Sequence, residues 1–324
     1  MALDFTKGIL ILLMVVYHWG NFFLGFVPYF YDLLRFLTPS FILITGSIVS
    51  MVYVPRYGLN DRRMYRRLLV RGTKLLLLFT FLNLAIHALS LAGGRVRPMG
   101  LHEFGASLFD IYVTGNSYVA SFRILLPIAY LLLFSVGFLQ VLRWPRSLVV
   151  VLAFGVCAGL QVTEVAGWTY YNLVLLSFGF LGLALDCLGF ERINNMAARL
   201  PVVILCYAVY LGIVLVWGPL YWVQLLGVSL TLLLIYGIGL RCSGQKAASR
   251  AIVLVGHYSL LAYIAQIGFL QALLFIVKRF LLIDAVSIIA LFAALTLTVL
   301  LVFGTELARK RSTLADKLYR LVFS

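Results

Sequence analysis

The sequence predicts an all-α fold, a polytopic bundle of about ten transmembrane helices with both chain ends in the cytoplasm. Of the 324 residues, 63% are hydrophobic and only 11% are charged, and the mean hydropathy is +1.06. Soluble domains are closer to half apolar and a quarter charged. The apolar runs suit helices of about 20 residues, whereas outer-membrane barrels have alternating strands of about 10 residues. Because lipid cannot satisfy backbone polar groups, such runs must cross as helices.

Each expected helix is one apolar run. The fifth run is the shortest, and only "WGPLYW" separates the seventh from the eighth. The largest outward loop covers about 93–117, and residues 1–324 are expected to form a single integral-membrane domain. The ten expected spans are 8–27, 35–54, 68–92, 118–142, 147–163, 169–187, 200–218, 220–240, 252–277 and 282–305.

The cationic residues set the expected orientation. The net charge is +15, and most of the 26 lysines and arginines fall in the N-terminus, the even-numbered loops and the C-terminus. Lysine and arginine accumulate in the cytoplasmic loops of membrane proteins, which accounts for the charge without a nucleic-acid partner. We therefore expect a multi-pass protein of the cytoplasmic (inner) membrane, with the lipid bilayer as its surroundings.

The cysteines give no sign of a disulfide framework or a metal site. They are far apart, show no CxxC spacing, and lie in or beside apolar segments, where thiols usually serve packing. We expect no bound metal. The four are Cys157, Cys187, Cys206 and Cys242.

A polar stripe runs along the first span. Lys7 and His18 are eleven residues apart, so on a helix they share a face to within about 20° and are separated by about 16 Å along the axis. Asp4 and Asn21 fall near the same stripe. A titratable ring inside the apolar run must face the bundle interior or a wet cavity. It serves either as a hydrogen-bonding link between helices or as a functional group, and the stripe alone leaves both open.

A second polar feature opens the third span, in "DRRMYRRLLVRGTKLLLLF". Arg63, Arg67, Arg71 and Lys74 project within an arc of about 80° on a helix. Such clusters usually mark the cytoplasmic side and contact anionic lipid headgroups. Guanidinium forks on one helix face also suit a polyphosphate ligand. The spacing fits both interpretations.

Four segments carry a family resemblance. They are "LDFTKGILILLMVVYH", "FLTPSFILITGSIVS", "YRRLLVRGTKLL" and "VGHYSLLAYIAQ". In order and placement they resemble the motifs of transmembrane acyltransferases of the acyltransferase type 3 clan, which includes the heparan-α-glucosaminide N-acetyltransferase-like families. The first is similar to the family's opening motif, an acidic residue, Arg-Gly and an apolar stretch ending in His. This sequence has Lys7 where Arg is usual, and Gln266 where many members have a late His.

The resemblance implies transfer of an acyl group, usually acetyl, from cytoplasmic acyl-CoA to a hydroxyl or amine of a sugar, glycan or other polar acceptor. It implies His18 as the general base or the acyl carrier, with Asp4 as a second catalytic residue. Gln266 does not titrate, which predicts that the late motif lines the site. The residues expected to bind the CoA phosphates are Lys7, Arg63, Arg66, Arg67, Arg71 and Lys74, and those expected to contact the acceptor are Asn21, Ser259, Tyr263 and Gln266.

Two other classes remain as alternatives. A transporter or flippase for a glycan or lipid-linked substrate also suits spans with Gly interruptions and an internal His. The acid–base pairs typical of proton-coupled transport are mostly absent from the spans, which argues against it. A structural membrane subunit does not account for the polar stripe. The sequence leaves the oligomeric state open, with a homodimer as one arrangement.

Overall fold

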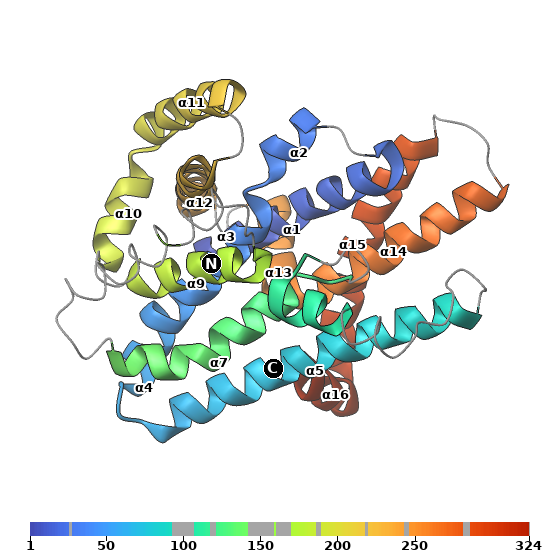
Figure 1. Cartoon of the computed structure of the whole chain (residues 1–324), viewed down its shortest axis with the longest axis horizontal. Coiled ribbons are helices and arrows are strands. Elements are labelled where there is room, and N and C mark those ends of the chain that lie inside the picture. Colours follow the sequence, from blue (N-terminus) through green and yellow to red (C-terminus); the bar gives the residue numbers. More distant parts are fainter. Residues whose placement is uncertain are drawn as a thin grey trace. The chain divides into compact units, whose positions relative to one another are not determined.

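A computed structural model describes most of the chain, and all regular structure in the described part is helical (Figure 1). Among the described residues, six helices are long and apolar enough to cross a membrane by length and composition, or up to seven if one bent pair counts as a single span. The predicted class, a helical protein with several membrane-spanning helices, is thus confirmed, while ten spans and cytoplasmic termini stay predictions. The described residues are 1–25, 28–92, 107–116, 121–141, 159, 170–185, 189–217, 220–242, 246–280 and 286–323.

Two expected features lie outside the described residues: the fifth span at 147–163, apart from residue 159, and most of the outward loop at 93–117. Of the cysteines, Cys206 and Cys242 are free and exposed, and the other two also lie outside the described ranges.

The chain divides into two compact units, and each is described by itself. Unit 1 comprises Met1–Leu37 and Glu191–Ser324, and unit 2 comprises Thr38–Phe190. The expectation of one integral-membrane domain stays a prediction. The helices of unit 1 are α1 (Ala2–Trp19), the π-helix η1 (Gly20–Leu24), α2 (Pro28–Leu34), α10 (Phe190–Ala198), α11 (Leu200–Trp217), α12 (Tyr221–Cys242), α13 (Ala247–His257), α14 (Ser259–Phe280), α15 (Val286–Arg311) and α16 (Thr313–Phe323).

Helix α1 is the centre of unit 1, where it packs against α12, α13, α14 and α15. An apolar run of Ile, Leu, Met and Val at residues 9–16 forms most of this helix, and the carboxylate of Asp4 in its first turn interacts favourably with the positive end of the helix dipole. Leu10, Ile11, Met14 and Val15 are at most 1% exposed. One face of α1 is therefore packed against other helices, while the rest of its surface is partly exposed.

Two glycines bring α1 and α13 into backbone contact. A Cβ on Gly8 would lie 2.0 Å from the carbonyl oxygen of Ile252, and a Cβ on Gly256 would lie 1.7 Å from the carbonyl oxygen of Asp4. Small residues at helix crossings in membranes allow this close approach. The glycine of the opening sequence motif and the glycine of the late motif thus meet at one crossing.

The expected span 252–277 is broken in the structure. Helix α13 ends at His257, Tyr258 has φ −98° and ψ 26°, and α14 begins at Ser259. The break lets α13 cross the first half of α1 while α14 packs against its second half, where Leu270 joins a cluster with Val15. The apolar run continues through Tyr258, so hydropathy carries no sign of the break.

Unit 2 uses the same small-residue packing. A Cβ on Gly46 of α3 would lie 2.1 Å from the carbonyl oxygen of Gly179 in α9, and a Cβ on Gly182 would lie 2.2 Å from the carbonyl oxygen of Leu43. Helix α5 runs beside α7, with Gly72 at the contact (Figure 1). The helices of unit 2 are α3 (Leu37–Ile48), η2 (Val49–Tyr53), α4 (Val54–Tyr57), α5 (Arg62–Ala92), η3 (Asp110–Thr114), α7 (Leu125–Val141) and α9 (Tyr171–Ala184).

The crossing of α1 and α13 can be tested with single methyl groups. Gly8→Ala and Gly256→Ala should each lower the thermal unfolding midpoint in detergent, because the new Cβ meets backbone that cannot rotate away. Overpacking of this kind costs roughly 1–3 kcal/mol. Gly212→Ala in α11 is the matched control: its Cβ enters open space, and alanine is the better helix former. A Gly256→Ala variant that unfolds at the wild-type temperature would contradict the contact.

Candidate functional site

His18 lies in an aromatic cage near the end of α1. Its ring centroid is 5.3 Å from that of Tyr17, 6.4 Å from Phe22 and 6.2 Å from Tyr263 on α14. The ring nitrogen Nε2 is buried and has no hydrogen-bond partner among the described residues. Nε2 of the imidazole is therefore covered by protein, while the residue as a whole is partly exposed.

Helix α14 brings a second polar group to the α1 side. Tyr263 and Gln266 are one turn apart on the same helix face, and Ser259 lies one turn before them at the start of the helix. Gln266 is fully buried, and within the described part of the chain neither its amide oxygen nor its amide nitrogen has a partner. Each such orphaned polar atom costs about 1–3 kcal/mol. Their gathering with Nε2 of His18 on two packed helices suits a polar ligand.

A π-helix follows His18 directly. Single π turns within α-helices occur frequently at functional sites. Gly20 leaves room for the ring of Phe30 in α2, which would lie 2.3 Å from a Cβ at this position. Asn21 is exposed on this turn, so an acceptor contact through its amide stays a prediction.

The N-terminal end of the stripe is an ion pair. The Nζ atom of Lys7 is 2.7 Å from Oδ1 of Asp4, and the α-amino group of Met1 is 3.8 Å from Oδ2. Asp4 and His18 are fourteen residues apart on α1, which separates them by about 21 Å along the axis. The local action of Asp4 is thus to hold Lys7, and its catalytic role stays a prediction.

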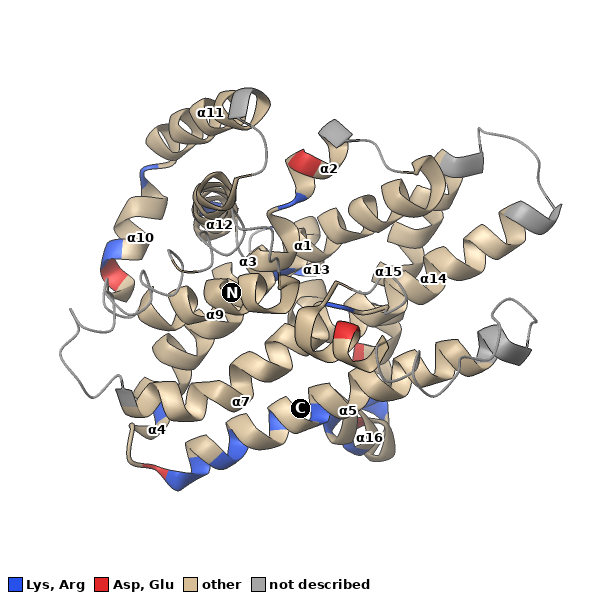
Figure 2. Ribbon diagram, in the orientation of Figure 1, with Lys and Arg blue, Asp and Glu red and all other residues tan. Residues whose placement is uncertain are grey.

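The arginine-rich helix start in unit 2 is capped by Asp61. Its carboxylate accepts a hydrogen bond of 2.8 Å from the backbone N–H of Arg63, and the guanidinium Nε of Arg63 lies 3.2 Å from the other carboxylate oxygen. An aspartate at this position stabilises a helix start. Figure 2 shows the cations along the first half of α5. Arg66 is exposed with no ion pair among the described residues, so its charge is open to a ligand.

Two tyrosines orient two of these arginines. Arg67 donates a hydrogen bond to the hydroxyl of Tyr57, and its guanidinium lies 5.0 Å from that ring's centroid. Arg71 donates to the hydroxyl of Tyr53, with its guanidinium 6.0 Å from the ring centroid. Both arginines stay exposed, while Lys74 is half-buried one turn further on. The tyrosines, four residues apart in "VYVPRY", were not expected from the sequence, although their i,i+4 spacing places them on one helix face.

The fold and these polar groups define a class: a helical membrane protein with an imidazole among packed apolar helices and an arginine-lined helix start. The chain matches no protein-family model, no curated protein and no solved structure. The functional assignment therefore depends on the residues themselves.

A cluster of hydrogen-bonded and ion-paired side chains at the C-terminal end of α15 was also not predicted from the sequence. The hydroxyl of Tyr258 donates to the Glu306 carboxylate and accepts a 2.7 Å hydrogen bond from Arg309. Arg309 also donates to Asp316 of α16 at 2.7 and 2.9 Å and lies 4.1 Å from the ring centroid of Tyr319. This cluster fastens α16 to α15 and to the break between α13 and α14. The sequence shows only the i,i+3 spacing of Glu306 and Arg309, and this spacing does not predict the contacts with Tyr258 and Asp316.

The Arg309–Asp316 contact predicts the exchange behaviour of α16. Asp316→Asn should make the α16 amides exchange several-fold faster at neutral pH, measured by hydrogen exchange in detergent, while Lys317→Gln, which removes an exposed charge on the same helix, should not. The Arg309 guanidinium holds the pKa of the Asp316 carboxyl below its ordinary value. Protection in the wild type should thus persist as the pH falls to about 3.9 and be lost only below it, after correction for intrinsic rates. Equal protection in Asp316→Asn and the wild type would exclude this role.

Proposed function

We propose that the protein is an integral-membrane acyltransferase, which moves an acyl group, acetyl in the simplest case, from acyl-CoA to a hydroxyl or amine of a sugar, glycan or similar polar acceptor. The observation that carries the proposal is the buried, unpartnered Nε2 of His18. A merely structural histidine on a packed helix would have this nitrogen hydrogen-bonded to a neighbour. A base or an acyl carrier needs this nitrogen free of a permanent hydrogen-bond partner.

The proposed reaction uses His18 as a base. Nε2 takes the proton as the acceptor oxygen or nitrogen attacks the thioester carbonyl, the carbon–sulfur bond breaks, and the CoA thiolate takes a proton to leave as the free thiol. The neutral imidazole is the form that accepts a proton. In the two-step version Nε2 attacks the thioester itself and the acceptor then attacks the acyl-imidazole.

Gln266 suits a second role in the same step. Its amide N–H groups are donors, and a negative oxygen develops on the thioester carbonyl as the acceptor attacks. Preorganised donors at such an oxygen are a large source of rate enhancement in a dry site. The buried and unpartnered amide of Gln266 supports this role, and Gln at this position needs no proton of its own to transfer.

The arginine-lined start of α5 is proposed to bind the phosphates of acyl-CoA. Arg67 and Arg71 are held by tyrosine hydroxyls, which reduces the rotamer freedom that phosphate binding would have to remove. Both guanidinium groups remain exposed and each can contact phosphate oxygens through two N–H donors. In this proposal Arg63, Arg66 and Lys74 add charge around the two oriented arginines.

The role of His18 is tested with purified protein, acetyl-CoA and a hexosamine acceptor. His18→Ala should lower kcat by about 10²–10⁴-fold, as the loss of a general base does. Free CoA is followed by chromatography, because the exposed thiols of Cys206 and Cys242 would react with a thiol reagent. His257→Ala, which removes an exposed histidine of the same unit, is the matched control and should retain wild-type turnover.

The outcomes separate the proposed mechanisms. Radiolabelled acetyl retained on the wild type without acceptor, and absent from His18→Ala, identifies the two-step route. If His18→Ala turns over as fast as the wild type, the enzyme role of this ring is refuted. Acceptor transport without CoA release would favour the transporter class instead.

The double variant Arg67→Gln, Arg71→Gln tests the donor site. It should weaken CoA binding by about tenfold or more, since charge-assisted contacts are lost and 1.4 kcal/mol is a factor of ten. Calorimetric titration with CoA measures the change, and raising the salt concentration should weaken wild-type binding more than that of the variant.

The matched control is Arg192→Gln, Arg199→Gln, which removes the same charge from exposed positions in unit 1. Tyr57→Phe should give a smaller loss than the arginine variant, because it frees Arg67 without removing its charge. Unchanged CoA affinity in the Arg67 and Arg71 double variant would refute the donor site and favour the alternative, in which the arginines contact anionic lipid headgroups.

A further inference from the structure

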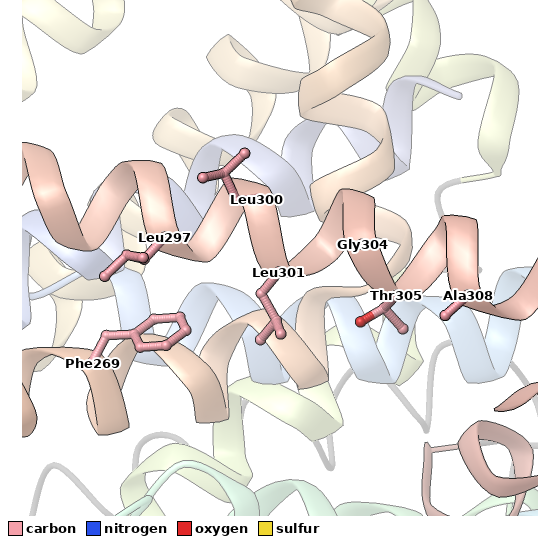
Figure 3. A pocket seen from close by; sticks show the side chains of 7 residues that line it. All are labelled: Phe269, Leu297, Leu300, Leu301, Gly304, Thr305 and Ala308. Atoms are coloured by element: carbon pink, nitrogen blue, oxygen red, sulfur yellow. The ribbon is translucent and has the colours of Figure 1, made fainter.

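An open apolar groove of about 490 Å³ follows α15 on its α14 side (Figure 3). Gly304 and Ala308 leave room for the groove, because neither has a large side chain. Nothing lies within 4 Å of a Cβ placed on Gly304. The groove is apolar apart from the hydroxyl of Thr305. The lining residues are Phe269, Leu297, Leu300, Leu301, Gly304, Thr305 and Ala308.

The length of the groove matches half a bilayer. From Leu297 to Ala308 there are eleven residues, which span about 16 Å along the helix. The hydrocarbon core is about 30 Å thick, so one leaflet contributes about 15 Å. Leu300 is 60% exposed and Gly304 and Ala308 are also exposed, so this face of α15 has no protein cover in the described part of the chain. The groove thus has the length of an acyl chain lying along one leaflet.

Basic side chains lie at one end of the groove. Arg311 is seven residues beyond Gly304, which places it on the same face of α15 to within about 20°. Within the described residues Arg311 makes no ion pair, whereas neighbouring Lys310 is 2.8 Å from Glu306. An acyl chain lying in the groove would therefore have one end near the guanidinium of Arg311, whose charge is not neutralised by a described residue. That arrangement fits a lipid with an anionic headgroup.

Helix α16 marks the level of the headgroups. It has exposed leucines at 314, 318 and 321 along one face and exposed Lys317 and Arg320 beside that face. An amphipathic helix of this composition lies in the membrane interface. Its attachment to α15 through Arg309 and Asp316 fixes it at the cationic end of the groove. Each cation near an anionic membrane surface is worth about 1 kcal/mol.

We infer that the groove on α14 and α15 holds an acyl chain of an anionic phospholipid, with its phosphate at Arg311 and Lys317. The charge at the end of the groove favours this occupant over a second copy of the chain. In a two-fold symmetric contact a second copy would bring the same cations to the same place. The lipid belongs to the leaflet that the C-terminal end of α15 reaches.

The test is a competition between two lipids of equal chain length. Protein in neutral detergent is mixed with equal amounts of phosphatidylglycerol and phosphatidylcholine, and retained lipid is counted by native mass spectrometry. The wild type should retain phosphatidylglycerol several-fold over phosphatidylcholine. Arg311→Gln, Lys317→Gln should bring that ratio close to one, and Gly304→Leu, whose side chain fills the groove, should lower retention of both lipids several-fold.

Two matched variants control for charge and bulk. Arg192→Gln, Arg199→Gln and, separately, Gly212→Leu should keep the wild-type ratio and retention. Leucine at position 304 enters open space and improves helix propensity, so loss of folding is not expected. Equal retention of the two lipids by the wild type overturns the inference, as does wild-type retention by Gly304→Leu. Gly304→Leu converting a dimer into monomers with lipid retention unchanged would show an interface between copies instead and would also overturn it.

Discussion

The backbone contact of Gly8 with Ile252 and of Gly256 with Asp4 fixes the position of the first helix in its unit. Helices rarely approach so closely, and here the two backbones touch where any side chain would separate them. Helix α13 ends just after this crossing, and α14, which follows Tyr258, brings Tyr263 to His18. The contact of two small residues thus determines which groups the imidazole meets some 15 Å further along α1.

The polar groups of unit 1 lie in two contrasting environments. Around Arg309, donors and acceptors are matched: guanidinium to carboxylate, hydroxyl to carboxylate, and cation to aromatic ring. Around His18 the neighbours are aromatic, and the orphaned atoms of His18 and Gln266 remain without partners in the described chain. Matched networks rigidify a fold, whereas an unmatched one lowers stability and persists where it serves binding. The unmatched atoms at His18 therefore support the proposed chemistry, and the matched network at Arg309 supports a structural role.

The sequence predicted the features that depend on a single helix, namely its presence and the residues that share a face. Apolar runs predicted helices, and the position of His18 inside such a run predicted a helix partner for its ring, which is Tyr263 of α14. The interruption at Tyr258 could not be predicted, because the apolar sequence continues through it unchanged. The tyrosine partners of Arg67 and the ties of Arg309 depend on how helices pack, which periodicity does not contain.

The π turn after His18 has a consequence for how the helix tolerates changes in length. A π turn closes its hydrogen bonds over one residue more than an α turn, so Gly20–Leu24 stores a spare residue. Losing one residue there can be absorbed by tightening the turn, with the preceding helix left in phase. The same loss between Lys7 and His18 would swing the imidazole by about 100° relative to the lysine. Homologous chains of different length should accordingly gain or lose residues after the histidine and keep the interval before it constant.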